Sequence, residues 1–159
     1  MAGGIKEYIG DKVALITSSP FTYGYGDKGW QNLDADELEF TAPVEVDEVL
    51  NKGHVYLDMP ITNKIIIEAG GAKVRAYNLN MIFMFKSNID WTPQEHEQLI
   101  KFARSGVMNF INLLDADNRI IKELSEINEL EFMNMFDVNS TGIALTLKLT
   151  PKNFDSFCL

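Results

Sequence analysis

The most recognisable spacing for chemistry in this chain is Gly24-Tyr25-Gly26-Asp27-Lys28-Gly29. The pattern G-x-G-x-x-G can hold a dinucleotide pyrophosphate when a strand enters the first glycine and a helix leaves the last. We expect neither element, because Pro20 and polar residues precede Gly24 and the segment WQNLDADELEF after Gly29 is too short for that helix. A P-loop is also excluded, since the Walker spacing is absent. We therefore interpret residues 21–36 as a loop rather than a nucleotide site.

Other candidate catalytic groups are few. The chain has two imidazoles. We expect His96 to be solvated between Glu95 and Glu97, and His54 to lie at a turn after Gly53. No spacing of His, Cys, Asp and Glu resembles a zinc site, and the acidic residues 34–39 lack the glycine and closing glutamate of a calcium loop. We expect no catalytic residue, no metal and no cofactor, so we predict that the chain is not an enzyme.

The charge of the chain is strongly acidic. It has 159 residues, with 23 acidic against 14 basic side chains and a net charge of −9. This balance argues against a sequence-independent DNA binder and against an anionic membrane surface as a partner. One stretch contains no basic residue and is acidic at Asp34, Asp36, Glu37, Glu39, Glu45, Asp47 and Glu48. It predicts either a solvated face or a negative surface, such as a lumen wall along which DNA slides without binding.

The remaining totals predict a simple organisation. A chain of this length is expected to form one domain over residues 1–159. Its single cysteine, Cys158, cannot form an internal disulfide. No signal peptide is recognisable at the start, and no apolar run is long enough to cross a membrane. We therefore expect a cytosolic location.

The elements that must position these residues follow from periodicity. Residues 5–17 predict a short helix, or a helix followed by a strand. Strand-like runs lie at 38–49, 55–57, 65–68, 73–86, 124–136 and 143–150, with turns at Gly70-Gly71 and at the sequence DVNSTG. In the first run, Pro43 favours an edge strand or a break. Residues 73–86 give the clearest strand, with Tyr77, Leu79, Met81, Phe83 and Phe85 on one face.

A long helix is predicted after residue 92. Thr92 is the expected N-cap, Pro93 the first helical residue and Glu95 the partner in a capping box. An apolar stripe then follows at Leu99, Phe102, Ala103, Val107, Phe110, Ile111 and Leu114. The order of elements predicts an α+β fold: a mostly antiparallel sheet with this helix packed on one face, plus a short N-terminal helix.

Several side chains suit contacts between subunits. Large aromatic residues, which a partner's pocket can receive, occur in the glycine-rich loop at Phe21, Tyr23, Tyr25 and Trp30. They could equally fold back onto the sheet. Met84, Met133 and Met135 fall on the second face of their strands, where they could contact a partner or thicken the core. The short edge-like strands before Gly70 also invite sheet extension by a neighbouring chain.

The order of these segments resembles a known family. The series comprises FTYGYGDKGWQN, an acidic stretch, VYLDMPIT, VRAYNLNMIFMF, the capped helix ending FINLL, and ELEFMNMFDVNSTGIALTLKLT. It resembles bacteriophage neck and tail proteins of the tail-terminator or tail-completion type, particularly from Bacteroidetes phages and prophages. In that family a Phe-Asn-x-x-Asp phrase is followed by a glycine and an aromatic residue. Phe132, Asn134, Asp137 and Gly142 approximate the phrase, but Ile143 stands where the aromatic residue is common.

The resemblance implies a structural role in the virion. Copies of the chain would form a homo-oligomeric ring, commonly sixfold, that caps the tail tube and joins it to other neck and tail proteins. DNA would pass through its acidic lumen without specific binding, and assembly would occur in the cytoplasm of the bacterial host. The alternative from a different class is a small α+β domain that binds an apolar small molecule in a cavity between sheet and helix.

Overall fold

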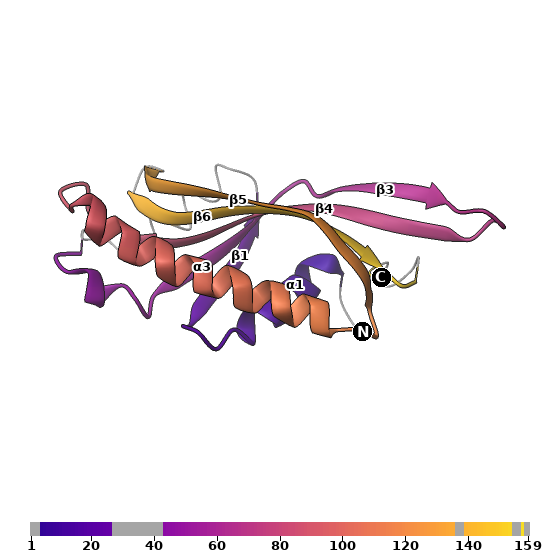
Figure 1. The fold of residues 1–159 in the computed structure, drawn as a ribbon, viewed down its shortest axis with the longest axis horizontal. Helices are drawn as coiled ribbons and strands as arrows, with labels where there is room; N and C mark the ends of the chain where they lie inside the picture. Colours follow the sequence, from indigo (N-terminus) through magenta and orange to yellow (C-terminus); the bar gives the residue numbers. More distant parts are fainter. Residues whose placement is uncertain (1–3, 27–42, 136–138, 154–156, 158–159) are drawn as a thin grey trace.

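The computed structural model describes residues 4–26, 43–135, 139–153 and 157, with Met135 described by its backbone. Figure 1 shows how the elements are arranged. In chain order they are α1 (Ile5–Ala14), β1 (Phe21–Gly26), the 3-10 turn η1 (Val46–Glu48), β2 (Gly53–Asp58), β3 (Thr62–Ile67), β4 (Lys73–Lys86), α3 (Pro93–Ala116), β5 (Ile121–Met135) and β6 (Ser140–Pro151).

The strands form one six-stranded sheet in the order β1-β2-β4-β6-β5, with β3 also paired to β4. Strands β1 and β2 are parallel, whereas the β2–β4, β3–β4, β4–β6 and β5–β6 pairs are antiparallel. The predicted α+β class with a mostly antiparallel sheet is therefore confirmed. Strands β2 and β3 pair with different halves of β4: β3 with its first half and β2 with its second half.

The long helix α3 begins at the predicted cap. The Thr92 hydroxyl accepts a hydrogen bond from the Glu95 N–H at 3.3 Å, and the Glu95 carboxylate accepts one from the Thr92 N–H at 3.3 Å. These bonds satisfy N–H groups that the first turn of a helix leaves free. The predicted stripe is buried at Leu99, Ala103, Val107, Phe110 and Leu114, but Phe102 is 36% exposed.

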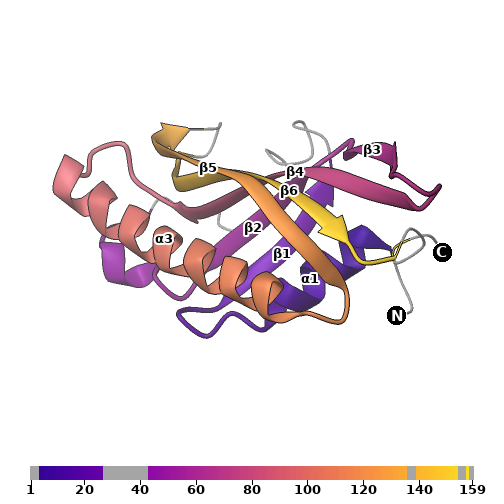
Figure 2. The ribbon, with the colours of Figure 1, turned by 45° about the vertical axis from the view of Figure 1, so that its right-hand side comes forward.

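One hydrophobic core joins the helices to the sheet. Figures 1 and 2 show α1 and α3 on the same side of the sheet. The core contains buried residues of α1, α3 and the alternating positions of β2, β4 and β6, including Leu57, Phe83, Phe110 and Leu145. Burying such side chains contributes the main stabilising term, about 1.5–3 kcal/mol for each.

The structure corrects two predictions of local structure. The segment from Phe21 to Gly26, predicted as loop, is strand β1, because pairing with β2 supplies the hydrogen bonds that its glycine-rich sequence does not favour locally. A strand therefore does contain Gly24, contrary to our expectation. Residues 46–48, which lie within the predicted strand 38–49, form a 3-10 turn instead. Pro43 precedes this turn and disfavours a continuous strand, because proline cannot donate a ladder hydrogen bond.

Both histidine predictions are wrong. His54 lies in β2 rather than at a turn and is 5% exposed. His96 lies in α3 but is 3% exposed, because its imidazole contacts Thr141 at the start of β6 instead of solvent. In the described residues, no helix combines the length and the apolarity needed to cross a membrane.

Candidate interaction surfaces

A two-stranded arm extends beyond the body of the sheet. We define the arm as residues 62–78, which comprise β3, the turn at Gly70-Gly71 and the half of β4 that pairs with β3. Both turn glycines have positive φ, 91° and 88°, which other residues adopt only with strain. Figure 1 shows this arm reaching past both helices on the right-hand side.

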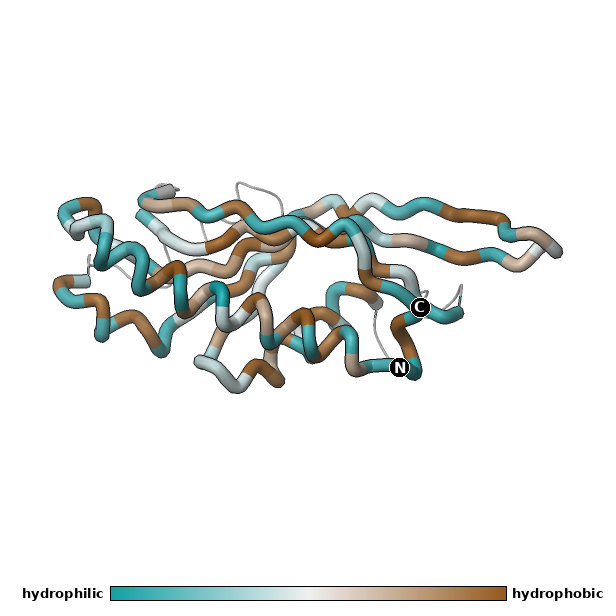
Figure 3. The backbone as a smooth tube through the Cα atoms, viewed as in Figure 1, coloured by the Kyte–Doolittle hydropathy of each residue, from teal (hydrophilic) through white to brown (hydrophobic). Residues whose placement is uncertain are grey.

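The arm exposes large apolar side chains. Asn63 pairs with Tyr77, so Asn63, Ile65 and Ile67 share the core face of the sheet with Tyr77. The Tyr77 ring packs against Phe157 at 5.5 Å between centroids, and this contact closes the core at its end. Ile65 and Ile67 lie beyond that contact, and they are 52% and 69% exposed. Figure 3 shows the hydrophobic stretch of β3 on the arm.

Strand β5 presents a second exposed apolar surface at an open sheet edge. Its described pairing is with β6 alone, and the regular part of that pairing runs from Asn128 to Phe132. Three apolar side chains are exposed on it: Ile127 at 40%, Leu130 at 69% and Met133 at 39%. Irregular register at both ends of the regular part limits the length of edge that another strand can join.

The predicted interface residues fall into three groups. Phe21 and Tyr23 are half-buried against the protein's own core: a Cβ at Gly106 would lie 2.6 Å from the Phe21 ring, and one at Gly10 would lie 2.8 Å from Tyr23. Tyr25 is 47% exposed and Met133 is exposed, so both are accessible to a partner. Trp30 and the side chain of Met135 lie outside the described residues.

The acidic candidates are only partly described. Glu45 precedes η1 and Asp47 lies within it, and both are exposed to solvent. Asp34, Asp36, Glu37 and Glu39 lie outside the described residues. The second-face methionine Met84 is 2% exposed, so it belongs to the interior of the folded chain.

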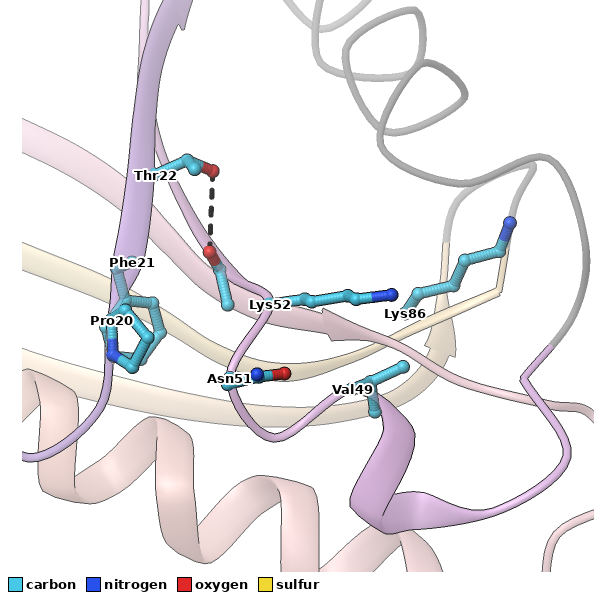
Figure 4. Close-up of a pocket in the computed structure, with 8 residues that line it drawn as sticks. Pro20, Phe21, Thr22, Val49, Asn51, Lys52 and Lys86 are labelled. Atoms are coloured by element: carbon cyan, nitrogen blue, oxygen red, sulfur yellow. Dashed lines mark hydrogen bonds between the residues drawn. The ribbon is translucent and has the colours of Figure 1, made fainter.

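A pocket of about 270 Å³ lies where β1 and β2 begin and β4 ends. Figure 4 shows its lining, with Pro20 and Phe21 at one end and Lys52 and Lys86 at the other. Both lysine side chains take part in interactions of their own, so the pocket does not offer two free cations. The space between the sheet and α3 is occupied instead by fully buried side chains such as Phe83 and Phe110.

A closed ring of hydrogen bonds surrounds His96. The His96 Nδ1 lies 2.9 Å from Thr141 Oγ1, Thr141 Oγ1 donates to Ser87 Oγ at 2.9 Å, and Ser87 Oγ lies 3.1 Å from Asn134 Oδ1. The Asn134 Nδ2 then lies 3.2 Å from His96 Nε2. Thr141 uses its proton on Ser87, so we assign a neutral His96 that donates from Nδ1 and accepts at Nε2. Burial lowers the pKa of His96, although the nearby Glu95 opposes the shift.

The geometry of this hydrogen-bond ring fits a structural role. Ser87 and Thr141 are 1% and 0% exposed, so neither hydroxyl can reach a substrate in solution. The ring joins the start of α3 to the ends of β4, β5 and β6, and the Thr141 hydroxyl also accepts the Asn134 backbone N–H at 3.2 Å. Asn134 has a φ of 50°, a conformation that its amide side chain tolerates better than most. Sequence reasoning missed the ring because its members are distant in the chain.

A second polar cluster fixes α1 to the end of α3. The Tyr8 hydroxyl donates to Asp117 at 2.8 Å, and the Lys12 ammonium lies 3.0 Å from the same carboxylate oxygen. Burial alone would raise the pKa of Asp117, but the hydrogen bonds from Lys12 and Tyr8 and the positive charges of Lys12 and Arg119 together hold it below its usual value. The described residues contain no group of three or more His, Cys, Asp and Glu that could hold a metal ion.

No family model matches the chain, and no curated protein matches its sequence.

The burial of His54 predicts a dependence of stability on pH. Its Nδ1 lies 2.5 Å from Thr22 Oγ1, its buried Nε2 has no hydrogen-bond partner among the described residues, and burial lowers its pKa to about 4. Between about pH 6.5 and pH 4 the unfolded chain binds this proton and the folded chain does not, so stability is full above the window and falls as the pH falls through it. We expect His54 to contribute up to about 3 kcal/mol to that loss.

Urea unfolding of the wild type and of His54→Gln across this pH range measures the contribution. Protonation of other groups, His96 included, acts on both proteins, so the difference between the two pH profiles reports His54. We expect a shallower profile for His54→Gln. Identical slopes would show that the His54 ring is protonated as readily in the folded chain as in the unfolded one.

Proposed function

We propose that this chain is a structural subunit of a bacteriophage neck or tail, which assembles into a ring at the head-proximal end of the tail. The observation that carries the proposal is the arm, whose exposed Ile65 and Ile67 lie beyond the closed core. Isolated monomers rarely keep a regular, apolar edge strand open to solvent, because such an edge pairs readily with another chain. Assembly into a ring would cover it.

The two exposed surfaces support a ring in particular. The arm and β5 are different surfaces of one chain, and contact between two different surfaces is heterologous. Heterologous contacts repeat from copy to copy and close into a ring when the rotation between copies allows it. The resemblance to tail-terminator and tail-completion proteins implies the same arrangement, commonly with sixfold symmetry.

The charge of the chain supports passage of DNA through the ring. A net charge of −9 repels phosphate, so a lumen lined by acidic side chains would let the genome move without binding. Glu45 and Asp47 are exposed and available for such a lining. In this role the chain needs no cofactor, contacts other neck and tail proteins, and joins the virion after synthesis in the host cytoplasm.

Light scattering of the purified full chain over a range of concentrations and salt tests the proposal, with electron microscopy of the heaviest species. We expect an oligomer near six copies that forms rings. Because exposed charges are screened by salt, we expect weaker assembly at high ionic strength. A monomer at every concentration, with no ring particles in the images, would contradict the proposal.

A further inference from the structure

We infer that the arm of one copy docks on the open β5 edge of the next, so that the sheet continues from subunit to subunit. This inference rests on the ring proposed above and names the two surfaces that meet. The partner that occupies the β5 edge is the arm of a second copy of this chain. Three features of the described residues lead to it: the state of the two edges, their exposed side chains and their charges.

The two edges can pair as strands. The β3–β4 pairing has no register shift from Thr62 to Ile67, so the outer side of β3 presents a regular row of backbone donors and acceptors. On β5 the regular segment from Asn128 to Phe132 offers a row of similar length. An extended strand that joins a sheet edge gains affinity from main-chain hydrogen bonds and specificity from its side chains.

The exposed apolar side chains lie on these segments or next to them. Ile65 and Ile67 belong to β3, Leu130 lies within the regular segment of β5, and Ile127 and Met133 flank that segment. Burial of a large aliphatic side chain on association removes apolar surface from water, which favours binding. Branched aliphatic residues also suit cross-strand contacts in a sheet.

The charges of the two surfaces are opposite. The arm has Lys64, Lys73 and Arg75 against Glu68, a net of +2, whereas β5 has Glu123, Glu126, Glu129 and Glu131 against Lys122, a net of −3. Within one chain Lys122 and Glu68 pair with each other at 3.1 Å. A second ion pair joins Arg104 of α3 to Glu131. Outside these two pairs the arm still exposes the basic side chains of Lys64 and Lys73, and β5 still exposes the acidic side chains of Glu123, Glu126 and Glu129.

The opposite charges of the arm and of β5 indicate which surface binds at the β5 edge. An arm that met another arm, or a β5 edge that met another β5 edge, would bring like charges together, which disfavours a two-fold contact of either kind. Contact between the arm of one copy and the β5 edge of another brings opposite charges together. The charge pattern therefore favours a head-to-tail series of identical copies, which is the arrangement that a ring requires.

Charge reversal on each surface tests the inference. One full-length variant carries Lys64→Glu and Lys73→Glu on the arm, and the other carries Glu126→Lys and Glu129→Lys on β5. All four side chains are exposed, so both variants should fold, and circular dichroism checks that they do. Alone, each variant would place like charges at every contact, and we expect its half-assembly concentration to rise by about tenfold or more.

The equimolar mixture of the two variants gives the decisive result. The acidic arm of the first then meets the basic edge of the second, and the basic arm of the second meets the acidic edge of the first. We expect light scattering to show assembly of the mixture near the wild-type concentration. If the wild type assembles and the mixture does not, or if each variant assembles as well as the wild type, the pairing of these surfaces is wrong while the proposed ring stands.

Cross-linking locates the contact directly. In a Cys158→Ser background, chains with Ile67→Cys are mixed with chains with Leu130→Cys and treated with a short bis-maleimide. We expect a mixed dimer, because both positions are 69% exposed and lie on the two surfaces that meet. Val44→Cys is the matched control, since Val44 is 75% exposed but belongs to neither surface. Equal yields with the control would overturn the inference. A wild type that remains monomeric throughout would instead count against the ring itself.

Discussion

Replacing Gly142 with alanine is expected to lower the free energy of unfolding by more than about 4 kcal/mol, enough to unfold many domains of this size. Gly142 lies in β6 between Met84 of β4 and Phe132 of β5. A Cβ at this position would overlap the carbonyl oxygen of Phe83 and lie 2.9 Å from the Met84 Cα. The obstructing atoms are backbone atoms of a central strand, so they cannot move aside without breaking the β4–β6 ladder.

A second glycine substitution separates this steric effect from conformational strain. Gly71→Ala places a Cβ in open space at a turn where φ is 88°, and we expect it to cost about 1–3 kcal/mol through strain alone. Both variants can be compared by urea unfolding followed by circular dichroism. A loss for Gly142→Ala no larger than that for Gly71→Ala would mean that β4 and β6 separate more easily than their ladder indicates.

Replacing Thr141 with valine is expected to lower the free energy of unfolding by about 3–5 kcal/mol, although the two side chains have nearly the same shape. Thr141 Oγ1 interacts with His96, Ser87 and the Asn134 backbone N–H. Valine would leave the buried donors of His96 and Asn134 without an acceptor and Ser87 without a donor. Each buried group left unsatisfied costs about 1–3 kcal/mol.

Thr146→Val on the same strand is the matched control, because Thr146 is exposed and should tolerate the change within about 0.5 kcal/mol. Nitrogen NMR of His96 adds a readout that a change in packing would not move. In the wild type we expect the proton on Nδ1 at neutral pH. Observation of the proton on Nε2 would show that the ring of hydrogen bonds runs in a different direction from the one assigned.

The sequence alone determined the elements with long, regular periodicity. Strand β4 occupies the predicted residues 73–86, and α3 begins at the predicted cap at Thr92. The turn at Gly70-Gly71 also has the positive φ angles that a double glycine favours. These features follow from interactions between residues a few positions apart, such as capping hydrogen bonds and alternation of side chains. Local sequence therefore suffices to predict them.

The sequence also indicated part of the candidate interface. The apolar run before Gly70 predicted an edge strand open to a neighbouring chain, and β3 is such an edge in the described sheet. It did not indicate that Leu130 would be exposed or that the arm and β5 would carry opposite residual charge. Those features depend on which strands lie at the edges and on the pairing of Lys122 with Glu68, 54 positions apart.

Only the tertiary structure decided the rest. The segment FTYGYG became a strand because β2 lies beside it, and a glycine-rich sequence has too little strand propensity to predict this without its partner. His96 became buried because Thr141 and Asn134, 45 and 38 positions away, satisfy both of its nitrogens. A polar side chain can leave water when distant residues replace its hydrogen bonds. Burial of that kind is a property of the folded chain, and no local pattern of residues encodes it.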